Sequence, residues 1–403
     1  MVVGPLRATE ESRKRPPPLL LAYAFRPFFL LAAFWLLIAM GLWLLSLSGV
    51  AWAPTLSPGW HAHEMLFAVV SAAAAGFALT AVATWTGTPP LAGLPLAGLI
   101  LLWILGRVFM LLDPIVNAEG FLFTALLGTV NVLFLLAVAF ALGIRLQAAG
   151  NRRNYPLVLI LLVLAAAQAA WHFGDFDARL AFDAGLLAVA AMISLIAGRI
   201  TPAFTRNWLR GRNREESVRD FLPLEVLNVG AALLAALMIL AGAGQLAAGL
   251  CLVASLAALL RLLGWNGQRI LIEPLLWILH LAWLWLTVAL LLAGLAGLGL
   301  GVPSTLWWHA LGAGAIGTIL IGVMTRVALG HTGRPLQLPR GSTLLYALIS
   351  LAAFARIGAA LLPGAWWLPL LLFSGGAWML AWGGYLYLFG PILLAPRPDG
   401  RPG

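Results

Sequence analysis

Apolar stretches of about 20 residues recur along the whole chain and alternate with short polar segments. A helix needs about 20 such residues to cross a hydrocarbon core of ~30 Å. The pattern therefore predicts an all-α polytopic membrane protein with about twelve membrane-spanning helices. They are expected at residues 24–47, 62–85, 93–112, 120–144, 155–172, 179–200, 221–243, 245–263, 272–296, 305–329, 343–362 and 364–390.

Composition supports this class and leaves no room for a soluble domain. Hydrophobic residues make up 62% of the chain and charged residues 9%, so a soluble fold could not cover the apolar surface. The longest polar stretch is the loop at 201–220. We expect a solvated tail at 1–23 that leads into a retained first helix, one membrane domain at 24–390, and a second tail at 391–403.

The distribution of positive charge predicts the orientation. Alternating the sides of the helices leaves only Arg107, Arg179 and Arg356, of 24 Lys and Arg residues, on the face opposite the two termini. By the positive-inside rule, both termini are cytoplasmic. The net charge of +10 is then mainly a topology signal. Basic segments such as the loop at 199–220 are expected to contact anionic lipid headgroups, and no nucleic-acid partner is expected.

The six histidines fall at different predicted depths. Orientation places His280 near the midplane and His331 at the cytoplasmic end of its span. The other four lie at the outer ends of spans: His61, His63, His172 and His309. Three of these follow a tryptophan directly, in "GWHAH", "AWHFG" and "WWHAL", and the Trp-His dipeptide is expected to introduce helices four spans apart.

An internal repeat accompanies these dipeptides. At an offset of about 248 residues, Pro27 matches Pro274, His61 matches His309, and Arg107 matches Arg356. The chain is therefore expected to contain four-helix units at 24–144, 155–263 and 272–390, of which the middle one is the most diverged. Repeated membrane bundles commonly hold their sites at the interfaces between units.

The segment "WHAHEM" at 60–65 carries the most distinctive chemistry. On a helix, His61, Glu64 and Met65 share a face, while His63 lies about 200° away from His61. The two histidines then serve two centres, and neutral imidazole is a ligand for haem iron and for copper. The alternative is that these residues belong to the aromatic belt of the membrane interface, where a half-wet ring is common.

Several other chemistries are excluded. The single Cys251 rules out Cys-held iron–sulfur clusters and a CxxCH haem attachment, so any haem is of the b type. The sequence contains no HExxH zinc motif, no P-loop and no dinucleotide fingerprint.

Five segments together resemble the NnrS family: "FRPFF" at 25–29, "WHAHEM" at 60–65, "GFALTAVATWTGTPP" at 76–90, "GRITPAFTRN" at 198–207, and "HALGAGAIGTILIGVMTRVALGHTGRPL" at 309–336. The resemblance departs at "TWTG", where an asparagine is expected before "WTG". It implies a twelve-span protein of the bacterial inner membrane that contains haem and copper and is linked to nitric oxide metabolism and nitrosative stress.

The candidate roles follow from depth, repeat position and side-chain chemistry. The candidate metal ligands are His61, His63, His309, His172 and His280. Arg107 and Arg356, which the repeat relates, are candidates for holding haem propionates, with lipid-facing snorkelling as the alternative. Glu64 is a candidate for proton transfer or for orienting a histidine.

Two function classes stay open. The first is an enzyme that reduces NO to N2O at a haem–copper centre near the outer face, with a quinol or cytochrome c as electron donor. Its architecture would be reminiscent of haem–copper oxidases, although the histidine pair that those proteins carry on their seventh span is missing at 221–243. The second is a non-catalytic protein that binds or transports NO, nitrosyl-iron or a metal, with midplane Asn131, Gln168, Glu225 and Asn228 along its pathway.

Overall fold

The computed structural model describes residues 17–50, 55–116, 121–173, 177–213, 218–362 and 364–401. Within these ranges the chain is helical, without strands, and contains twelve helices long and apolar enough to cross a membrane. The predicted fold class of a multi-pass, all-α membrane protein is therefore confirmed. The tail expected at 1–23 lies mostly outside the described residues.

The helices run as follows: α1 (Phe25–Leu47), α2 (Pro58–His63), η2 (Glu64–Ala68), α3 (Val69–Thr86), α4 (Leu94–Val116), α5 (Phe121–Ala148), α6 (Tyr155–Phe173), α7 (Ala178–Arg210), α8 (Leu222–Leu240), α9 (Gly244–Gly264), α10 (Pro274–Gly297), α11 (Ser304–His309), η5 (Ala310–Ile316), α12 (Gly317–His331), α13 (Ser342–Leu361) and α14 (Trp367–Leu394). The segments α2–η2–α3 form one span, and α11–η5–α12 form another. Short 3₁₀ turns occur at Leu19–Leu21, Arg152–Asn154, Gly267–Arg269 and Gly364–Trp366.

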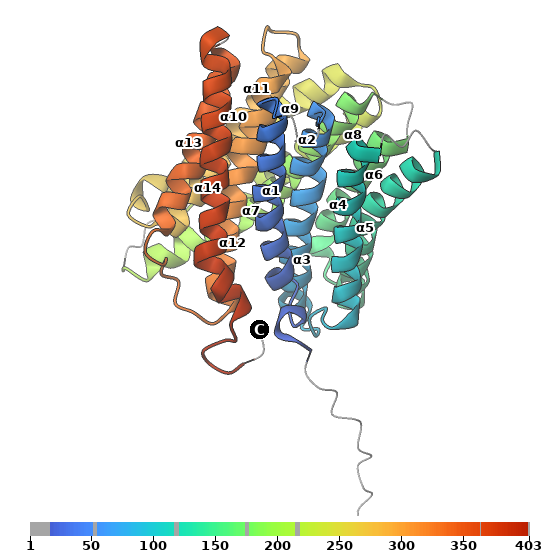
Figure 1. Cartoon of the computed structure of the whole chain (residues 1–403). Helices are drawn as coiled ribbons and strands as arrows, with labels where there is room; N and C mark the ends of the chain where they lie inside the picture. The colour runs from blue at the N-terminus through green and yellow to red at the C-terminus, as the bar shows by residue number, and fades with distance from the viewer. Residues whose placement is uncertain are drawn as a thin grey trace, which may run out of the picture.

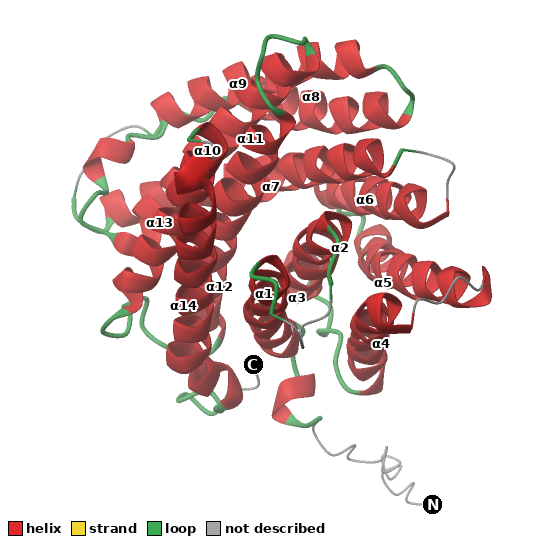
Figure 2. Ribbon diagram, turned by 45° about the horizontal axis from the view of Figure 1, so that its top comes forward, coloured by secondary structure: helices red, strands yellow, loops and turns green. Residues whose placement is uncertain are grey.

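The helices stand side by side in a bundle, and both described ends of the chain lie at the same end of it (Figure 1). In a view tilted by 45°, α4, α5, α6, α8 and α9 follow one another around the outside of the bundle, and α13 and α14 lie on its other side (Figure 2). Contacts between α1 and α14 close the arrangement. The common end of the termini matches the predicted even number of crossings.

Two spans form the centre of this bundle. In each of the spans that contain α3 and α7, 83% of the most apolar window is buried, whereas the corresponding value for the span of α4 is 28%. The span of α3 begins with the "WHAHEM" segment. Its His63 and Glu64 side chains are fully buried, where an unpaired polar group is costly.

The span of α7 is longer than predicted. The polar stretch at 201–220 was predicted to be a loop, but α7 continues through Pro202 to Arg210. The side chains of Thr201, Thr205 and Leu209 are buried, and the Thr205 hydroxyl donates to the carbonyl of Thr201 at 2.9 Å. Tertiary packing of this face outweighs the helix-breaking tendency of the proline.

A shared irregularity relates the first and last parts of the chain. Directly after His63 the backbone forms a π-helical segment, η2, and directly after His309 it forms another, η5. Both follow a short α-helix that contains a Trp-His dipeptide. Such π-bulges occur frequently at functional sites, and their matched positions agree with the offset seen in the sequence.

Candidate functional site

Most of the "WHAHEM" segment lies in helix α2, and two contacts fix the position of this helix. The Ser57 hydroxyl caps the helix by accepting from the Trp60 backbone N–H at 3.0 Å, and Pro58 follows at the first turn. The Trp60 indole N–H donates to the carbonyl of Met110 on α4 at 2.8 Å. These contacts fix the direction in which the two histidines of α2 point.

His61 points into a cavity of about 460 Å³, a size typical of small-molecule and cofactor pockets. Its walls are mostly apolar and come from α1, α2, α7, η5 and α14. The lining side chains with nitrogen-bearing or cationic groups include His61, His309, Arg179 and Arg356. The cavity thus gathers the repeat-related histidines of α2 and α11 with two arginines from other helices.

The two histidines of the cavity are oriented differently. The ring of His61 stacks on Trp43 with centroids 4.8 Å apart and an angle of 14° between the planes, and its Nδ1 is buried without a hydrogen-bond partner among the described residues. The His309 Nδ1 lies 2.7 Å from the carbonyl of Thr305. Because a carbonyl only accepts, His309 Nδ1 carries the proton and Nε2 has the free lone pair.

Contacts at the edge of the cavity hold α11 against α7. The Trp308 indole donates to Asp183 Oδ1 at 2.6 Å, and Arg179 donates to the Ser304 hydroxyl at 2.5 Å. The Arg179 guanidinium also lies 5.5 Å from the centre of the Trp308 ring. Arg179 therefore lines the cavity, although its sequence position indicated only a topological role.

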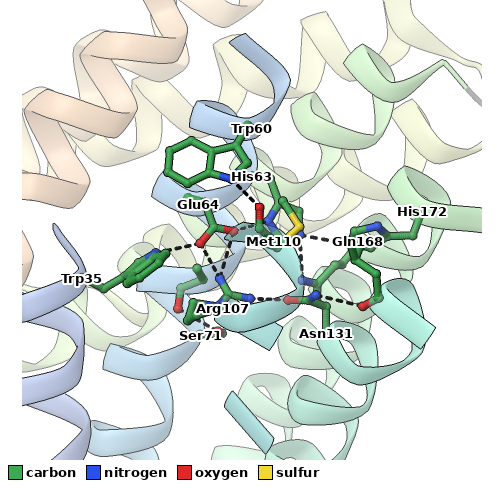
Figure 3. Close-up of polar contacts among 12 residues, drawn as sticks. Trp35, Trp60, His63, Glu64, Ser71, Arg107, Met110, Asn131, Gln168 and His172 are labelled. Carbon is green, nitrogen blue, oxygen red and sulfur yellow. Dashed lines mark hydrogen bonds and ion pairs between the residues drawn. The ribbon is translucent and has the colours of Figure 1, made fainter. Parts of the chain in front are cut away.

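His63 points away from this cavity and into a buried polar network (Figure 3). Its Nδ1 lies 2.7 Å from Glu64 Oε1. The Glu64 carboxylate also accepts two hydrogen bonds from Arg107, at 3.0 and 3.1 Å, and one from the Trp35 indole at 2.7 Å. His63 and Glu64 are fully buried and Arg107 is 5% exposed, so the three groups compensate one another away from water.

The other nitrogen of His63 faces a second histidine. His63 Nε2 and His172 Nε2 are 3.0 Å apart, and the Gln168 amide nitrogen lies 3.4 Å from His63 Nε2. His172 packs closely against α5 at Gly128. A Cβ atom added to this glycine would lie only 2.8 Å from the His172 Cβ. Asn131 on α5 accepts from Arg107 and joins the network to that helix.

The two sites are neighbours. Trp171 lines the cavity, while the next residue, His172, belongs to the polar network. The Trp171 ring centre lies 6.2 Å from that of His63. One tryptophan thus forms a wall between the cavity and the histidine pair.

The structure brings most of the candidate residues together, but not in the expected combinations. Glu64 was expected on the face of His61, yet it bonds to the adjacent His63, because the donors of the buried polar network lie on that side of the helix. Arg107 was paired with Arg356 as a candidate for haem propionates. Only Arg356 lines the cavity, and the guanidinium of Arg107 is engaged by Glu64 and Asn131.

Two further histidines lie differently from the expectation. His172 does not introduce a helix but ends one, α6, so it reaches the same end of the bundle from the opposite chain direction. His280 lies beside the loop between α9 and α10, where its ring packs against Gly267 and lies 6.1 Å from Trp265. It lines neither the cavity nor the polar network. His331 packs against Phe25 at 5.5 Å, also apart from both sites.

The described residues contain no group of three or more His, Cys, Asp or Glu side chains that could hold a metal ion. The side chains at the cavity are imidazoles with apolar and cationic neighbours. Those at the His63–His172 pair are imidazoles with the Gln168 amide and the Glu64 carboxylate beside them. Such a set suits a haem iron held by histidine, or a copper ion bound by imidazole, and it does not resemble a carboxylate site for calcium or magnesium.

Comparison with known proteins shows the family of the chain. No curated protein matches the chain. The family model described as "NnrS protein" matches residues 19–397, which include every described helix and both sites. The chain therefore belongs to the NnrS family, whose members are membrane proteins linked to nitric oxide.

Proposed function

We propose that this protein binds b-type haem in the cavity and copper at the His63–His172 pair, and that it reduces NO to N2O. The observation that carries the proposal is that His61 and His309 line one cavity while the His63–His172 pair lies beside it, with the His63 ring 6.2 Å from the ring of Trp171 in the cavity wall. NnrS proteins are generally associated with haem and copper, and the two pairs offer one site for each.

The cavity fits a haem group in its chemistry. Its apolar walls suit a macrocycle, and His61 and His309 present imidazoles to the same space. Arg179 and Arg356 supply cationic partners for the propionates. The absence of a CxxCH motif makes the attachment non-covalent.

The His63–His172 pair fits copper. Nδ1 of His63 is bonded to the Glu64 carboxylate, and a carboxylate on the far nitrogen of a metal-bound histidine is a common way to orient it. Nε2 of His63 therefore has its lone pair free for an ion. His63 is fully buried and His172 is half-buried, so most of the surface of the two ligands is kept from water.

Reduction joins two NO molecules with two electrons and two protons and yields N2O and water. Bound haem iron and copper would supply the binding and redox chemistry. The chain's own residues hold the histidines in position, keep bulk water from the apolar walls, and balance charge through Glu64 and Arg107. The electrons come from a quinol or a cytochrome c, and the location is the bacterial inner membrane.

The test is an anaerobic assay of the purified protein with reductant and NO, in which N2O is measured over time. Repeated formation of N2O, lost in His309→Ala but kept in His331→Ala, supports the proposal, because His331 lies outside both sites. Consumption of NO in a single stoichiometric step without N2O would instead establish the alternative, a protein that binds or transports NO, nitrosyl-iron or a metal.

A further inference from the structure

We infer that the Glu64–Arg107 ion pair makes the His63–His172 site selective for a monovalent soft cation, Cu(I), over divalent ions such as Zn²⁺ and Cu²⁺. The inference rests on the proposed copper site and deepens it, because it assigns the oxidation state in which the metal is taken up. It also gives Arg107 a positioning and charge-balancing role in place of a haem contact.

The charge of the site follows from its contacts. Arg107 keeps its proton in proteins, and its guanidinium makes two hydrogen bonds to the Glu64 carboxylate, at 3.0 and 3.1 Å. One positive and one negative group therefore cancel inside the bundle. The neutral Trp35 side chain donates a hydrogen bond to Glu64, and the neutral Asn131 side chain accepts one from Arg107.

The donors that face the site are neutral as well. The two imidazole Nε2 atoms lie 3.0 Å apart. Gln168 is 1% exposed, and its Oε1 has no hydrogen-bond partner among the described residues. Its amide nitrogen is the atom placed 3.4 Å from His63 Nε2, and a half-turn of the amide brings the orphaned oxygen to the imidazoles as a third neutral ligand.

A cation bound by neutral ligands brings its whole charge into a buried site. The cost of burying charge rises steeply with its magnitude, so an ion of charge +1 is favoured over one of charge +2 at this position. Divalent sites in proteins usually include anionic ligands for this reason. The carboxylate that bonds to the pair, Glu64, is already neutralised by Arg107. The charge of Asp113 also acts on His63, but the Asp113 side chain is exposed and, among the described residues, forms no ion pair with either histidine.

This charge balance makes a prediction that a purely structural role for Arg107 does not. The Arg107→Gln variant leaves Glu64 as an uncompensated anion beside His63, so the site should become more favourable for divalent ions. The ratio of Zn²⁺ affinity to Ag(I) affinity should rise by roughly 10- to 100-fold, as expected for removal of one nearby charge at an effective dielectric of about 20. Glu64→Gln leaves Arg107 positive and should abolish binding of both ions at this site.

The experiment uses full-length protein purified from copper-depleted cells, with Ag(I) as a redox-inert probe for Cu(I) and Zn²⁺ as the divalent probe. Bound metal is measured by equilibrium dialysis and elemental analysis in wild type, Arg107→Gln and Glu64→Gln. Arg199→Gln serves as a matched control, because Arg199 pairs with Glu225 at 2.6 Å on α7 and α8, away from both sites. Haem content and circular dichroism report whether each variant is folded.

The inference predicts that wild type and Arg199→Gln bind Ag(I) in preference to Zn²⁺, and that Arg107→Gln shifts the ratio towards Zn²⁺. Equal affinity of the wild type for both ions, or an unchanged ratio in folded Arg107→Gln, overturns the charge-balance inference and leaves the copper site in place. If the wild type binds neither ion, the proposed copper site itself fails. Turnover of NO is not needed for any of these readouts.

Discussion

His61 and His63 stand two residues apart on one short helix and yet belong to different sites. The ring of His61 stacks on Trp43 and lines the cavity, while His63 Nε2 lies 3.0 Å from His172 Nε2 in the buried polar network. Two positions along an α-helix correspond to a turn of about 200°. A single turn of helix thus supplies one imidazole to each of two neighbouring sites.

This relationship predicts different losses from the two alanine variants. His61→Ala should lose or strongly alter the haem spectrum and keep its copper, whereas His63→Ala should lose copper and keep haem. His309→Ala should resemble His61→Ala, because both residues line the cavity. Absorption spectra, haem extraction with acid acetone and elemental analysis of the purified proteins measure these contents. If all three variants retain full haem and copper, these histidines are members of the interfacial aromatic belt.

The position of His172 depends on a glycine of α5. A Cβ added at Gly128 would meet the His172 Cβ at 2.8 Å and the Phe173 ring at 2.6 Å, so Gly128→Ala should push His172 away from His63. We expect copper affinity to fall by about 10-fold or more, as for other changes that misplace a ligand. Metal titration of the purified variant measures this effect.

Gly143→Ala on the same helix is the matched control. Its nearest neighbour, a Val158 methyl, lies at an ordinary 3.7 Å, so this substitution should leave copper affinity unchanged and raise helix stability by up to about 1 kcal/mol. Equal copper binding in the two variants would show that the placement of His172 does not depend on α5.

The cavity itself can be filled without a change to any ligand. Gly312 of η5 lines the cavity, and a Cβ built there meets nothing within 4 Å. Gly312→Leu should therefore occupy part of the space and lower haem content several-fold, while copper at the His63–His172 pair is retained. Gly230→Leu on the exposed face of α8 is the control, since its Cβ position is also open. Full haem content in Gly312→Leu would mean that haem is bound elsewhere.

The sequence was sufficient for the spans, and it pointed to several of the residues that line the cavity and the polar network. Apolar length predicts a membrane helix well because the bilayer demands it, and the short turn between α8 and α9 lies where the pattern indicated. The predicted end of the span of α7, at residue 200, is too early, because Pro202 and the polar residues after it suggest a loop. Burial of Thr201 and Leu209 against the bundle, which keeps this stretch helical, has no signal in local composition.

The pairing of the site residues was less accessible from sequence. An ideal helix places Glu64 with His61, but its carboxylate turns to the buried donors around His63, which come from α1 and α4. The repeat offset related Arg107 to Arg356, but their environments differ. Arg107 forms an ion pair with Glu64, whereas Arg356 lines the cavity. Arg179 was missed because its role comes from Ser304 and Trp308, 125 or more residues along the chain.

The orientation of the bundle can be tested with single cysteines, because the only native cysteine, Cys251, is buried in α9 and should not react. Thr55 and Arg212 are both exposed and lie at opposite ends of the bundle according to the alternation of spans. Thr55→Cys should react with a membrane-impermeant maleimide in intact cells stripped of their outer membrane. Arg212→Cys should react only after the inner membrane is permeabilised, because the basic loop is retained inside by the positive-inside rule. Both variants should react in detergent, which controls for accessibility.

The reverse pattern would place the cavity and the His63–His172 pair at the cytoplasmic face, and electrons from an outer cytochrome c could then not reach them directly.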